Sequence, residues 1–236
     1  MTIIFYDLAA RDGRRFSGNA WRTCFALAHK ELKFETRSIR YIDIKAIADG
    51  NQLTVPVIED GSVIVRESWD IALYLEEAYP DRPSLFGAPV GKAYARHLNN
   101  WINTVLSRFM LGIVIKDVYN HLQSADKSYF RQSRVERFGK SLDEMVVKRE
   151  ECLLQLRDAL APVRAAIAMQ PFLGGSEPLY PDYLIAALFQ WGRAICPVEL
   201  IEDSDPLHPW FGRMLDLFDG LCRKQVAYWS PPQLTK

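Results

Sequence analysis

The sequence predicts two units in series: an α+β domain, in which helices cover a small sheet, and then an all-helical domain. In the first 80 residues, strand-like apolar runs alternate with segments of helical periodicity. A stretch rich in proline and glycine follows, and from Lys92 onward nearly all apolar residues recur at helical spacing. The predicted division is therefore residues 1–80, a linker at 81–91, and a helical domain at 92–236.

Each element of the first domain has a local reason in the sequence. Residues 2–8 are apolar and β-branched, which favours a strand, and the charged residues 11–15 that follow favour a loop. Apolar residues recur at helical spacing over 21–32, so a helix is expected there. Alternation at 34–39 predicts a second strand, and residues 42–48 carry a weaker helical pattern.

A hairpin and a further helix complete the first domain. Two short apolar runs, residues 55–58 and 63–65, flank Asp60-Gly61, a dipeptide that favours a tight turn. Ser68 then opens a helix that ends near Tyr79, because the prolines that follow disfavour a continued helix. This order of strands and helices describes a small sheet covered by helices.

The second domain is predicted to be all helical. Pro162 is expected to kink or end one long helical stretch, and Pro171 with Gly174-Gly175 marks a loop. Two shorter helices are expected at 182–194 and 209–222. The apolar stripes that carry the prediction are Tyr94, Leu98, Trp101, Ile102, Val105, Leu106 and Phe109, and then Leu153, Leu154, Leu156, Leu160 and Val163.

Composition places the chain among ordinary globular proteins. Its 236 residues are 49% hydrophobic and 25% charged, and 29 basic residues balance 29 acidic ones. Nucleic acid and membrane surfaces are therefore not expected as partners, because both attract an excess of basic residues. Apolar runs fall short of the roughly 20 residues that span a bilayer, and no charged-then-apolar leader opens the sequence, so a soluble cytoplasmic protein is expected.

The cysteines and histidines do not form a metal-binding pattern, and no metal site is predicted. We interpret the cysteines as buried thiols, because no C-x-x-C pair occurs among Cys24, Cys152, Cys196 and Cys222. Scattered histidines are usually surface or hydrogen-bonded residues, and we interpret in this way His29, His97, His121 and His208.

The first candidate functional motif is Phe16-Ser17-Gly18-Asn19-Ala20-Trp21, which places a serine at the start of the first helix. One interpretation is a helix N-cap, because a serine oxygen accepts hydrogen bonds from the free N–H groups there. The other interpretation uses the same location. A helix N-terminus and a hydroxyl donor stabilise an anion, so Ser17 would lower the pKa of a thiol bound beside it.

The second motif, Thr54-Val55-Pro56-Val57, opens a strand with a proline. A proline in this position is typical of an edge strand, and most X-Pro bonds are trans. If the Val55-Pro56 bond is cis, the N–H and C=O of Val55 point outward and can pair with the backbone of an extended peptide ligand.

The third motif, Arg66-Glu67-Ser68-Trp69, lies at the start of a helix. In the simpler interpretation Ser68 caps that helix. In the functional one, the N–H groups around Ser68 receive a carboxylate while Glu67 receives an ammonium group. Together they would bind the two charged ends of an amino acid.

In this order and spacing, the three motifs resemble those of the cytosolic glutathione S-transferase superfamily. The resemblance is narrower with its serine-type branch, which includes the fungal FuA-like transferases and the bacterial glutathione-dependent β-etherases. It implies an α+β thioredoxin-like first domain, with a four-stranded mixed sheet, followed by an all-α helical bundle. The stretches that carry the resemblance are residues 16–23, 26–30, 54–57, 67–69, 74–80, 172–175 and 180–183.

The resemblance also implies roles for individual residues. Ser17, the catalytic residue, would hydrogen-bond the glutathione sulfur. Val55 would pair with the cysteinyl backbone, and Gln52 would reach the glycyl carboxylate. Glu67 and Ser68 would hold the γ-glutamyl end. The implied glutathione-binding residues are thus Gln52, Val55, Pro56, Glu67 and Ser68.

The chain shows three departures from the family pattern. Branch relatives often have Ser-Pro and a cysteine where this chain has Gly18 and Ala20, so a disulfide-exchange mechanism is not available there. Asp182 matches the aspartate of a family folding element, but Leu179 replaces its usual Ser or Thr partner. The side-chain cap is therefore missing, although Asp182 can still accept a backbone hydrogen bond. Pro181 replaces an alanine, which a first helical turn tolerates.

The resemblance implies a glutathione transferase that activates the glutathione thiol as a thiolate for attack on a hydrophobic, aromatic electrophile. Glutathione is the implied co-substrate, and a homodimer is the implied assembly. Three alternatives stay open: cleavage of a β-aryl ether, binding of hydrophobic compounds without turnover, and a structural or regulatory role, which the intact motifs disfavour. The acceptor pocket or the core would contain Trp101, Phe109, Tyr119 and Tyr129.

Overall fold

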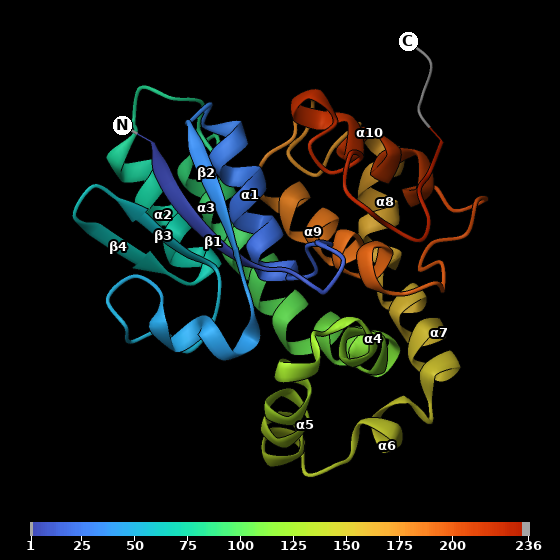
Figure 1. Cartoon of the computed structure of the whole chain (residues 1–236). Helices are drawn as coiled ribbons and strands as arrows, with labels where there is room; N and C mark the ends of the chain where they lie inside the picture. Colours follow the sequence, from blue (N-terminus) through green and yellow to red (C-terminus); the bar gives the residue numbers. More distant parts are fainter. Residues whose placement is uncertain (1, 233–236) are drawn as a thin grey trace.

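The computed structural model describes residues 2–232, and its first domain contains the predicted alternation of strands and helices (Figure 1). The segment expected to be weakly helical forms a short 3₁₀ helix. The elements in order are β1 (Ile3–Leu8), α1 (Gly18–His29), β2 (Phe34–Ile39), η1 (Tyr41–Ala46), β3 (Val57–Asp60), β4 (Val63–Arg66) and α2 (Ser68–Ala78).

The four strands form one mixed sheet in the order β2-β1-β3-β4. Strands β1 and β2 are parallel, whereas β3 is antiparallel to both β1 and β4. Phe5, at the middle of β1, is opposite Thr36 on one side and Ile58 on the other. This arrangement confirms the predicted four-stranded mixed sheet, and it brings the end of β1 beside the start of β3.

The second domain is helical throughout, as predicted. Its first helix begins at Pro89, inside the stretch expected to be linker, because proline is favoured in a first helical turn. The elements are α3 (Pro89–Trp101), a π-helical turn η2 (Ile102–Leu106), α4 (Ser107–His121), α5 (Ser124–Phe138), α6 (Leu142–Val146), α7 (Arg149–Ala159), α8 (Ala161–Met169), α9 (Tyr180–Ile195) and α10 (Leu207–Gly220). None of the helices within residues 2–232 is both long and apolar enough to cross a membrane.

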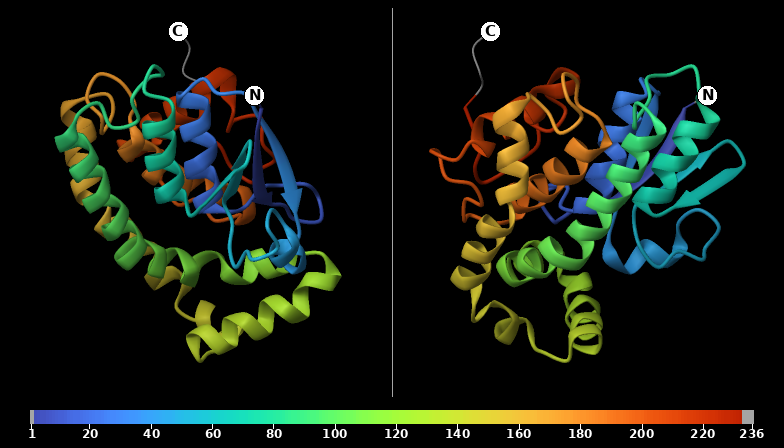
Figure 2. Two further views of the ribbon diagram at one scale, coloured as in Figure 1. Left: turned by 90° about the vertical axis from the view of Figure 1, so that its left-hand side faces the viewer. Right: turned by 180° about the vertical axis from the view of Figure 1, so that it is seen from behind.

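Helices α1 and α9 form the main contact between the two domains (Figures 1 and 2). Phe25 of α1 stacks on Tyr183 of α9 with ring centroids 5.1 Å apart and an interplanar angle of 5°. Nδ1 of His29 forms a hydrogen bond with the Tyr183 hydroxyl at 2.6 Å, and its Nε2 lies 3.0 Å from the Ser84 carbonyl oxygen. The histidine is thus hydrogen-bonded at both nitrogens, as one of its sequence interpretations expected.

Asp182 organises the loop that precedes α9. Its carboxylate is fully buried and accepts hydrogen bonds from the backbone N–H groups of Leu173 at 2.7 Å, Gly174 at 2.9 Å and Leu179 at 3.1 Å. The Trp210 indole adds a fourth donor at 3.3 Å. The backbone bonds that Asp182 was expected to keep are therefore present, and they compensate for the missing hydroxyl at position 179.

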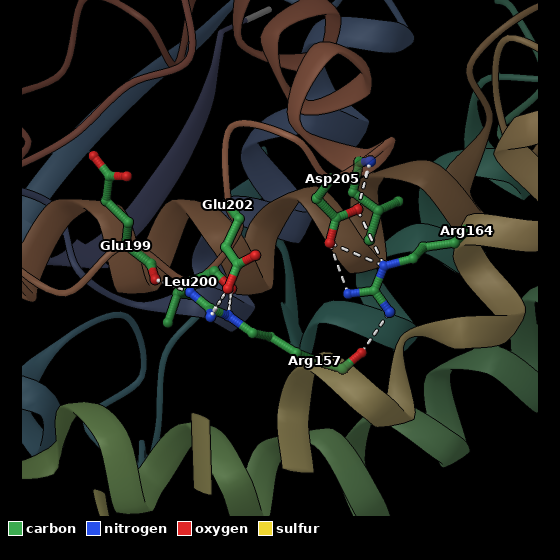
Figure 3. A network of polar contacts seen from close by, with 7 residues as sticks. Arg157, Arg164, Glu199, Leu200, Glu202 and Asp205 are labelled. Atoms are coloured by element: carbon green, nitrogen blue, oxygen red, sulfur yellow. Dashed lines mark hydrogen bonds and ion pairs between the residues drawn. The ribbon is translucent and has the colours of Figure 1, made fainter. Parts of the chain in front are cut away.

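Arg157 and Arg164 fasten the segment between α9 and α10 to helices α7 and α8 (Figure 3). Arg157 donates to the Leu200 carbonyl oxygen at 3.1 Å and forms an ion pair with Glu202. Arg164 donates to Asp205 from two nitrogens, at 2.9 and 2.7 Å. A forked pair between a guanidinium and a carboxylate fixes both the position and the orientation of the two groups. The segment between α9 and α10 is therefore held against the helical domain at two points.

Candidate active site

Ser17 occupies the N-cap position of α1, immediately after the loop that follows β1. Its Oγ accepts a hydrogen bond from the Ala20 N–H at 3.3 Å, so the N-cap interpretation is confirmed. A hydroxyl group has two acceptor sites and one donor proton, and the cap uses only an acceptor site. The N-cap role therefore leaves the Ser17 proton free for a ligand, and the two interpretations of this serine are compatible.

Arg22 places a positive charge on the same helix, near the interface with the second domain. The side chain is buried, and Nη1 donates to the amide oxygen of Asn99 at 3.1 Å and to that of Asn103 at 3.2 Å. The two asparagines therefore join α1 to α3 and to the π-helical turn η2. Burial lowers the pKa of the Arg22 guanidinium below its ordinary value.

The Val55-Pro56 peptide bond is cis, as the functional interpretation of this motif required. Both residues are buried and come directly before β3, whose Val57 is opposite Tyr6 of β1. Within residues 2–232, neither the N–H nor the C=O of Val55 takes part in a backbone hydrogen bond. The two groups are consequently available to an extended peptide.

Glu67 is the N-cap residue of α2, with φ 60° and ψ 131°, a backbone conformation that non-glycine residues rarely adopt. Its carboxylate accepts a hydrogen bond from the Thr54 hydroxyl at 2.7 Å, which joins the second motif to the third. No side chain of the described residues caps this helix, so the interpretation of Ser68 as a cap is wrong. Ser68 is instead the first helical residue, and the free N–H groups of the first turn can receive a carboxylate.

Tyr180 holds the start of α2 from the second domain. Its hydroxyl donates to the Ser68 carbonyl oxygen at 2.9 Å, and its ring is edge-to-face with Trp69, with centroids 5.9 Å apart. Burial raises the pKa of the Tyr180 hydroxyl, which therefore remains a donor. Tyr180 belongs to one of the stretches that carry the family resemblance, residues 180–183, but no sequence signal relates it to the start of α2.

Gln52 is buried, and both ends of its amide group are engaged. Its Oε1 accepts from Arg66 Nε at 2.7 Å, and its Nε2 donates to Asp49. Arg66 also forms an ion pair with Asp49. The Gln52 amide thus orients the exposed guanidinium of Arg66. The role of Gln52 toward the glycyl carboxylate stays a prediction, and Arg66 would present the positive charge to that carboxylate.

A cavity of about 430 Å³ opens at Ser17. Its lining residues come mainly from the start of α1 and from helices α4 and α5, whose positions Figure 1 shows. Aliphatic and aromatic side chains from both domains form most of its wall, and Arg22, Arg134 and Arg137 add charge. The π-helical turn contributes Asn103, and π-bulges occur frequently at functional sites. Its aromatic side chains are Phe16, Tyr41, Phe130, Phe138 and Trp191.

Of the predicted site residues, Ser17 alone lines this cavity; the predicted glutathione-binding residues lie outside its wall. The four aromatic residues considered for the acceptor pocket, at positions 101, 109, 119 and 129, do not line it either. The sequence pattern could not identify the rings that line this cavity, because Tyr41 of η1 and Phe130 of α5 meet only when the two domains pack together.

None of the four cysteines of the chain lines the cavity. Cys24, Cys196 and Cys222 are buried, in agreement with the sequence interpretation, and Cys152 is partly exposed. Burial raises the pKa of each of these thiols above its ordinary value. A protonated thiol is a poor nucleophile, so burial disfavours these cysteines as nucleophiles.

Comparison with known families agrees with this geometry. The model of the glutathione S-transferase N-terminal domain matches residues 13–83, and the model of the glutathione S-transferase C-terminal domain matches residues 93–215. The chain belongs to the glutathione S-transferase family. Family membership supports glutathione as the co-substrate of the transferase.

Solved structures and a curated relative show where this transferase is similar to others. The glutathione transferase FuA3 of Phanerochaete chrysosporium is 30% identical over 94% of this chain and 93% of its own, with a TM-score of 0.73. A glutathione S-transferase of Ceriporiopsis subvermispora, solved in complex with glutathione, has the same fold at 24% identity, with 95% of each chain covered and a TM-score of 0.74. A glutathione S-transferase-like protein of Aspergillus flavus is 32% identical over 146 residues, 54% of this chain, and the chain spans about half the length of that relative.

Proposed function

We propose that the protein is a serine-type glutathione transferase in which Ser17 donates a hydrogen bond to the sulfur of glutathione and keeps it as a thiolate. The observation that carries the proposal is the Ser17 hydroxyl at the N-terminus of α1, on the wall of the cavity and with a free donor proton. The helix dipole and the neighbouring Arg22 add positive potential at the same point.

In this proposal the peptide part of glutathione lies along the edge formed by the second and third motifs. Val55 pairs with the cysteinyl backbone through its free N–H and C=O groups. The γ-glutamyl carboxylate is received by the first turn of α2, and its ammonium group by Glu67. Pro56 sets the turn beside Val55, and Ser68 opens the helix. Gln52 acts through Arg66 toward the glycyl carboxylate.

The reaction is a substitution at an electrophilic carbon. The glutathione thiol loses its proton to solvent, and the thiolate attacks the carbon of an acceptor that lies in the cavity. A carbon–sulfur bond forms, and the leaving group departs with the electron pair of the bond that breaks. A thiol has an ordinary pKa of about 8.5, and each unit by which the site lowers it is about 1.4 kcal/mol, or tenfold in the thiolate-to-thiol ratio. A modest shift thus provides a nucleophile at neutral pH.

The experiment is a titration of bound glutathione, followed by the ultraviolet absorbance of the thiolate, in the wild-type protein and in Ser17→Ala. We expect the apparent pKa of the bound thiol to rise by about one to two units in Ser17→Ala. Equal values in the two proteins would remove the serine from the mechanism. Ser107→Ala is the matched control, because it deletes another hydroxyl from the wall of the same cavity.

Two acceptor assays separate the remaining possibilities. A halogenated nitroarene reports conjugation through release of halide, and a β-aryl ether model compound reports ether cleavage through release of a phenol. Binding of hydrophobic compounds without turnover of either acceptor would indicate a carrier. The assembly is proposed to be a homodimer, which light scattering after gel filtration tests with the same preparation.

A further inference from the structure

The charges on the wall of the cavity are all of one sign. Arg22 enters from α1, and Arg134 and Arg137 enter from α5 on the opposite wall. Aspartate and glutamate are absent from the residues that line the cavity within 2–232. Because the whole chain carries 29 basic and 29 acidic residues, this concentration of positive charge is local to the cavity.

Arg22 is a buried cation held by neutral partners. Its guanidinium contacts amide oxygens of Asn99 and Asn103 rather than a carboxylate. Its buried Nε has no hydrogen-bond partner among the described residues. Buried charges in proteins are normally paired, so Arg22 is stabilised further by any anion that enters the cavity.

Arg134 is fixed in a similar way on the other wall. One of its terminal nitrogens donates to the Tyr41 hydroxyl at 3.1 Å, and the other to Ser133 Oγ at 3.3 Å. The guanidinium lies 4.5 Å from the centroid of the Phe130 ring and 5.5 Å from that of Tyr41. Two aromatic rings thus hold the group in place while its charge stays uncompensated.

Ten of the nineteen arginines of the chain form an ion pair with an acid among the described residues, and the cavity arginines are not among these ten. Arg15 is paired with Asp7, Arg149 with Asp117, and Arg164 with Asp205. Within residues 2–232, none of the three arginines of the cavity forms an ion pair. Asp126, the buried acid of α5, forms no ion pair with any of them, and its Oδ1 accepts the Ile42 N–H at 3.1 Å.

Glutathione does not account for all of this charge. In the proposed binding mode its two carboxylates lie at the start of α2 and at Arg66, and the residues that hold them are not part of the cavity wall. Arg22, on the helix of Ser17, serves the thiolate. Arg134 and Arg137, which come from the second domain, remain for the acceptor.

We propose that the cavity selects an electrophilic acceptor that carries a carboxylate on an aromatic frame, with the carboxylate at Arg134 and Arg137 and the reacting carbon toward Ser17. This inference rests on the proposed function, because it takes the cavity to be the acceptor side of the transferase. The rings of Phe16, Phe130 and Trp191 pack against the aromatic frame. The carboxylate itself does not react: the thiolate adds to the carbon, and the halide or other leaving group departs with its electron pair.

The test compares 4-chloro-3-nitrobenzoate with 4-chloro-3-nitrobenzamide, which differ in charge but hardly in shape. Each kcat/KM is divided by the uncatalysed rate of the same acceptor with glutathione. We expect the wild-type protein to prefer the benzoate by about 10-fold or more, and the variant Arg134→Gln with Arg137→Gln to lose that preference. A wild-type protein with no preference, or a variant that retains the preference in full, would overturn the inference.

Arg131→Gln is the matched control. Arg131 lies on α5 and is not on the cavity wall, because its guanidinium donates to the Tyr119 hydroxyl at 2.5 Å and lies over that ring. We expect Arg131→Gln to keep the wild-type preference for the benzoate. Thermal unfolding of all variants shows whether each one is folded before its preference is interpreted.

A binding measurement separates failure of this inference from failure of the proposed function. Calorimetry compares the unreactive pair 3-nitrobenzoate and 3-nitrobenzamide in the presence of glutathione. Tighter binding of the benzoate that disappears in the double variant supports the inference even if no acceptor is turned over. Turnover of both chloro compounds with equal binding of the unreactive pair overturns the inference and leaves the transferase activity intact.

Discussion

The Arg22 guanidinium of α1 donates to Asn103 Oδ1 from both terminal nitrogens, at 3.2 Å in each case. Asn103 belongs to the π-helical turn η2, so this contact joins the helix of Ser17 to the second domain. A neutral amide holds the arginine without cancelling its charge. The positive potential of Arg22 is therefore retained at the cavity.

This relationship predicts the effect of Asn103→Asp. The new carboxylate would pair with Arg22 and cancel its positive charge, so the pKa of bound glutathione would rise by about one unit and turnover at neutral pH would fall. The folded state should be no less stable, because Asn103 is exposed and the new ion pair is favourable. Thiolate titration measures the pKa of bound glutathione, and urea unfolding measures the stability of the variant. An unchanged thiol pKa with a formed ion pair would contradict the role of Arg22.

The two roles of Ser17 can be separated by Ser17→Asp. Aspartate is as good an N-cap as serine, so this variant should unfold within about 0.5 kcal/mol of the wild type, whereas Ser17→Ala should lose about 1 kcal/mol. Its carboxylate lacks a donor proton and repels a thiolate, so Ser17→Asp should be the less active of the two variants. Urea unfolding and the conjugation assay provide the measurements. An active Ser17→Asp protein would mean that the serine only caps the helix.

Glu76 predicts a dependence of stability on pH. Burial acts to raise the pKa of its carboxyl, but hydrogen bonds from Lys30, Ser84 and the Leu85 N–H outweigh burial and hold the pKa below its ordinary value of 4.5. A carboxyl with a lowered folded-state pKa stabilises the fold above the unfolded-state pKa, and the stability is lost as pH falls through the folded-state value.

Unfolding of the wild-type protein should therefore become easier as the pH falls below about 4.5, and Glu76→Gln should remove part of that dependence. Glu77→Gln on the same helix is the control, because Glu77 is exposed and its side chain forms no hydrogen bond or ion pair among the described residues. Urea midpoints measured at several pH values check this prediction. Parallel curves for the wild type and Glu76→Gln would contradict it.

Asp182→Asn should destabilise the protein by about 2–4 kcal/mol. Oδ2 of Asp182 accepts two backbone N–H groups, and an amide NH₂ in that place would face donors and leave them unsatisfied. The other oxygen, Oδ1, also accepts two donors, the Leu173 N–H and the Trp210 indole. Neither orientation of the asparagine amide therefore avoids this loss. Asp158→Asn, at an exposed position without a partner among the described residues, should change stability by less than about 0.5 kcal/mol. The free energies of unfolding in urea decide between the two outcomes.

Arg164→Gln should cost about 2 kcal/mol of stability, because it leaves the nearly buried carboxylate of Asp205 without its forked partner (Figure 3). Arg82→Gln removes an exposed ion pair to Glu31 at 3.4 Å and should cost little. The melting temperatures of the two variants, measured against that of the wild type, test this difference in stability. An equal small effect in both would mean that the segment between α9 and α10 is held by its apolar contacts.

The course of the chain could be predicted largely from local patterns. Gly18–His29 and Ser68–Ala78 begin and end within a few residues of the predicted helices, because apolar periodicity and the prolines that end a helix are local signals. Ser17 could be identified for the same reason: a serine between a strand and a helix is visible in the sequence. The sequence indicated Ser68 as the cap of α2, whereas the N-cap residue is Glu67. The backbone conformation of Glu67 is rare for a residue other than glycine, and no sequence pattern indicates it.

The cavity beside Ser17 depends on contacts between residues that are distant in the sequence. Arg22 is an isolated charge on a predicted apolar helix, and the sequence gives no reason to relate it to Asn103, which is 81 positions away. The cavity wall combines Tyr41 of the first domain with Phe130 and Arg134 of the second, and these residues meet only when α5 packs against η1. Helical periodicity gives the buried face of each helix but not the partner that covers it.

By itself the sequence determined the order of strands and helices, the two-domain organisation and the serine at the start of α1, since each follows from residues close together in the chain. Only the tertiary structure decided which side chains enclose the space beside that serine, and that their charge is positive. The physical reason is that burial and charge balance depend on distances in space. Side chains far apart in sequence fix those distances when α1 and η1 pack against the helical domain.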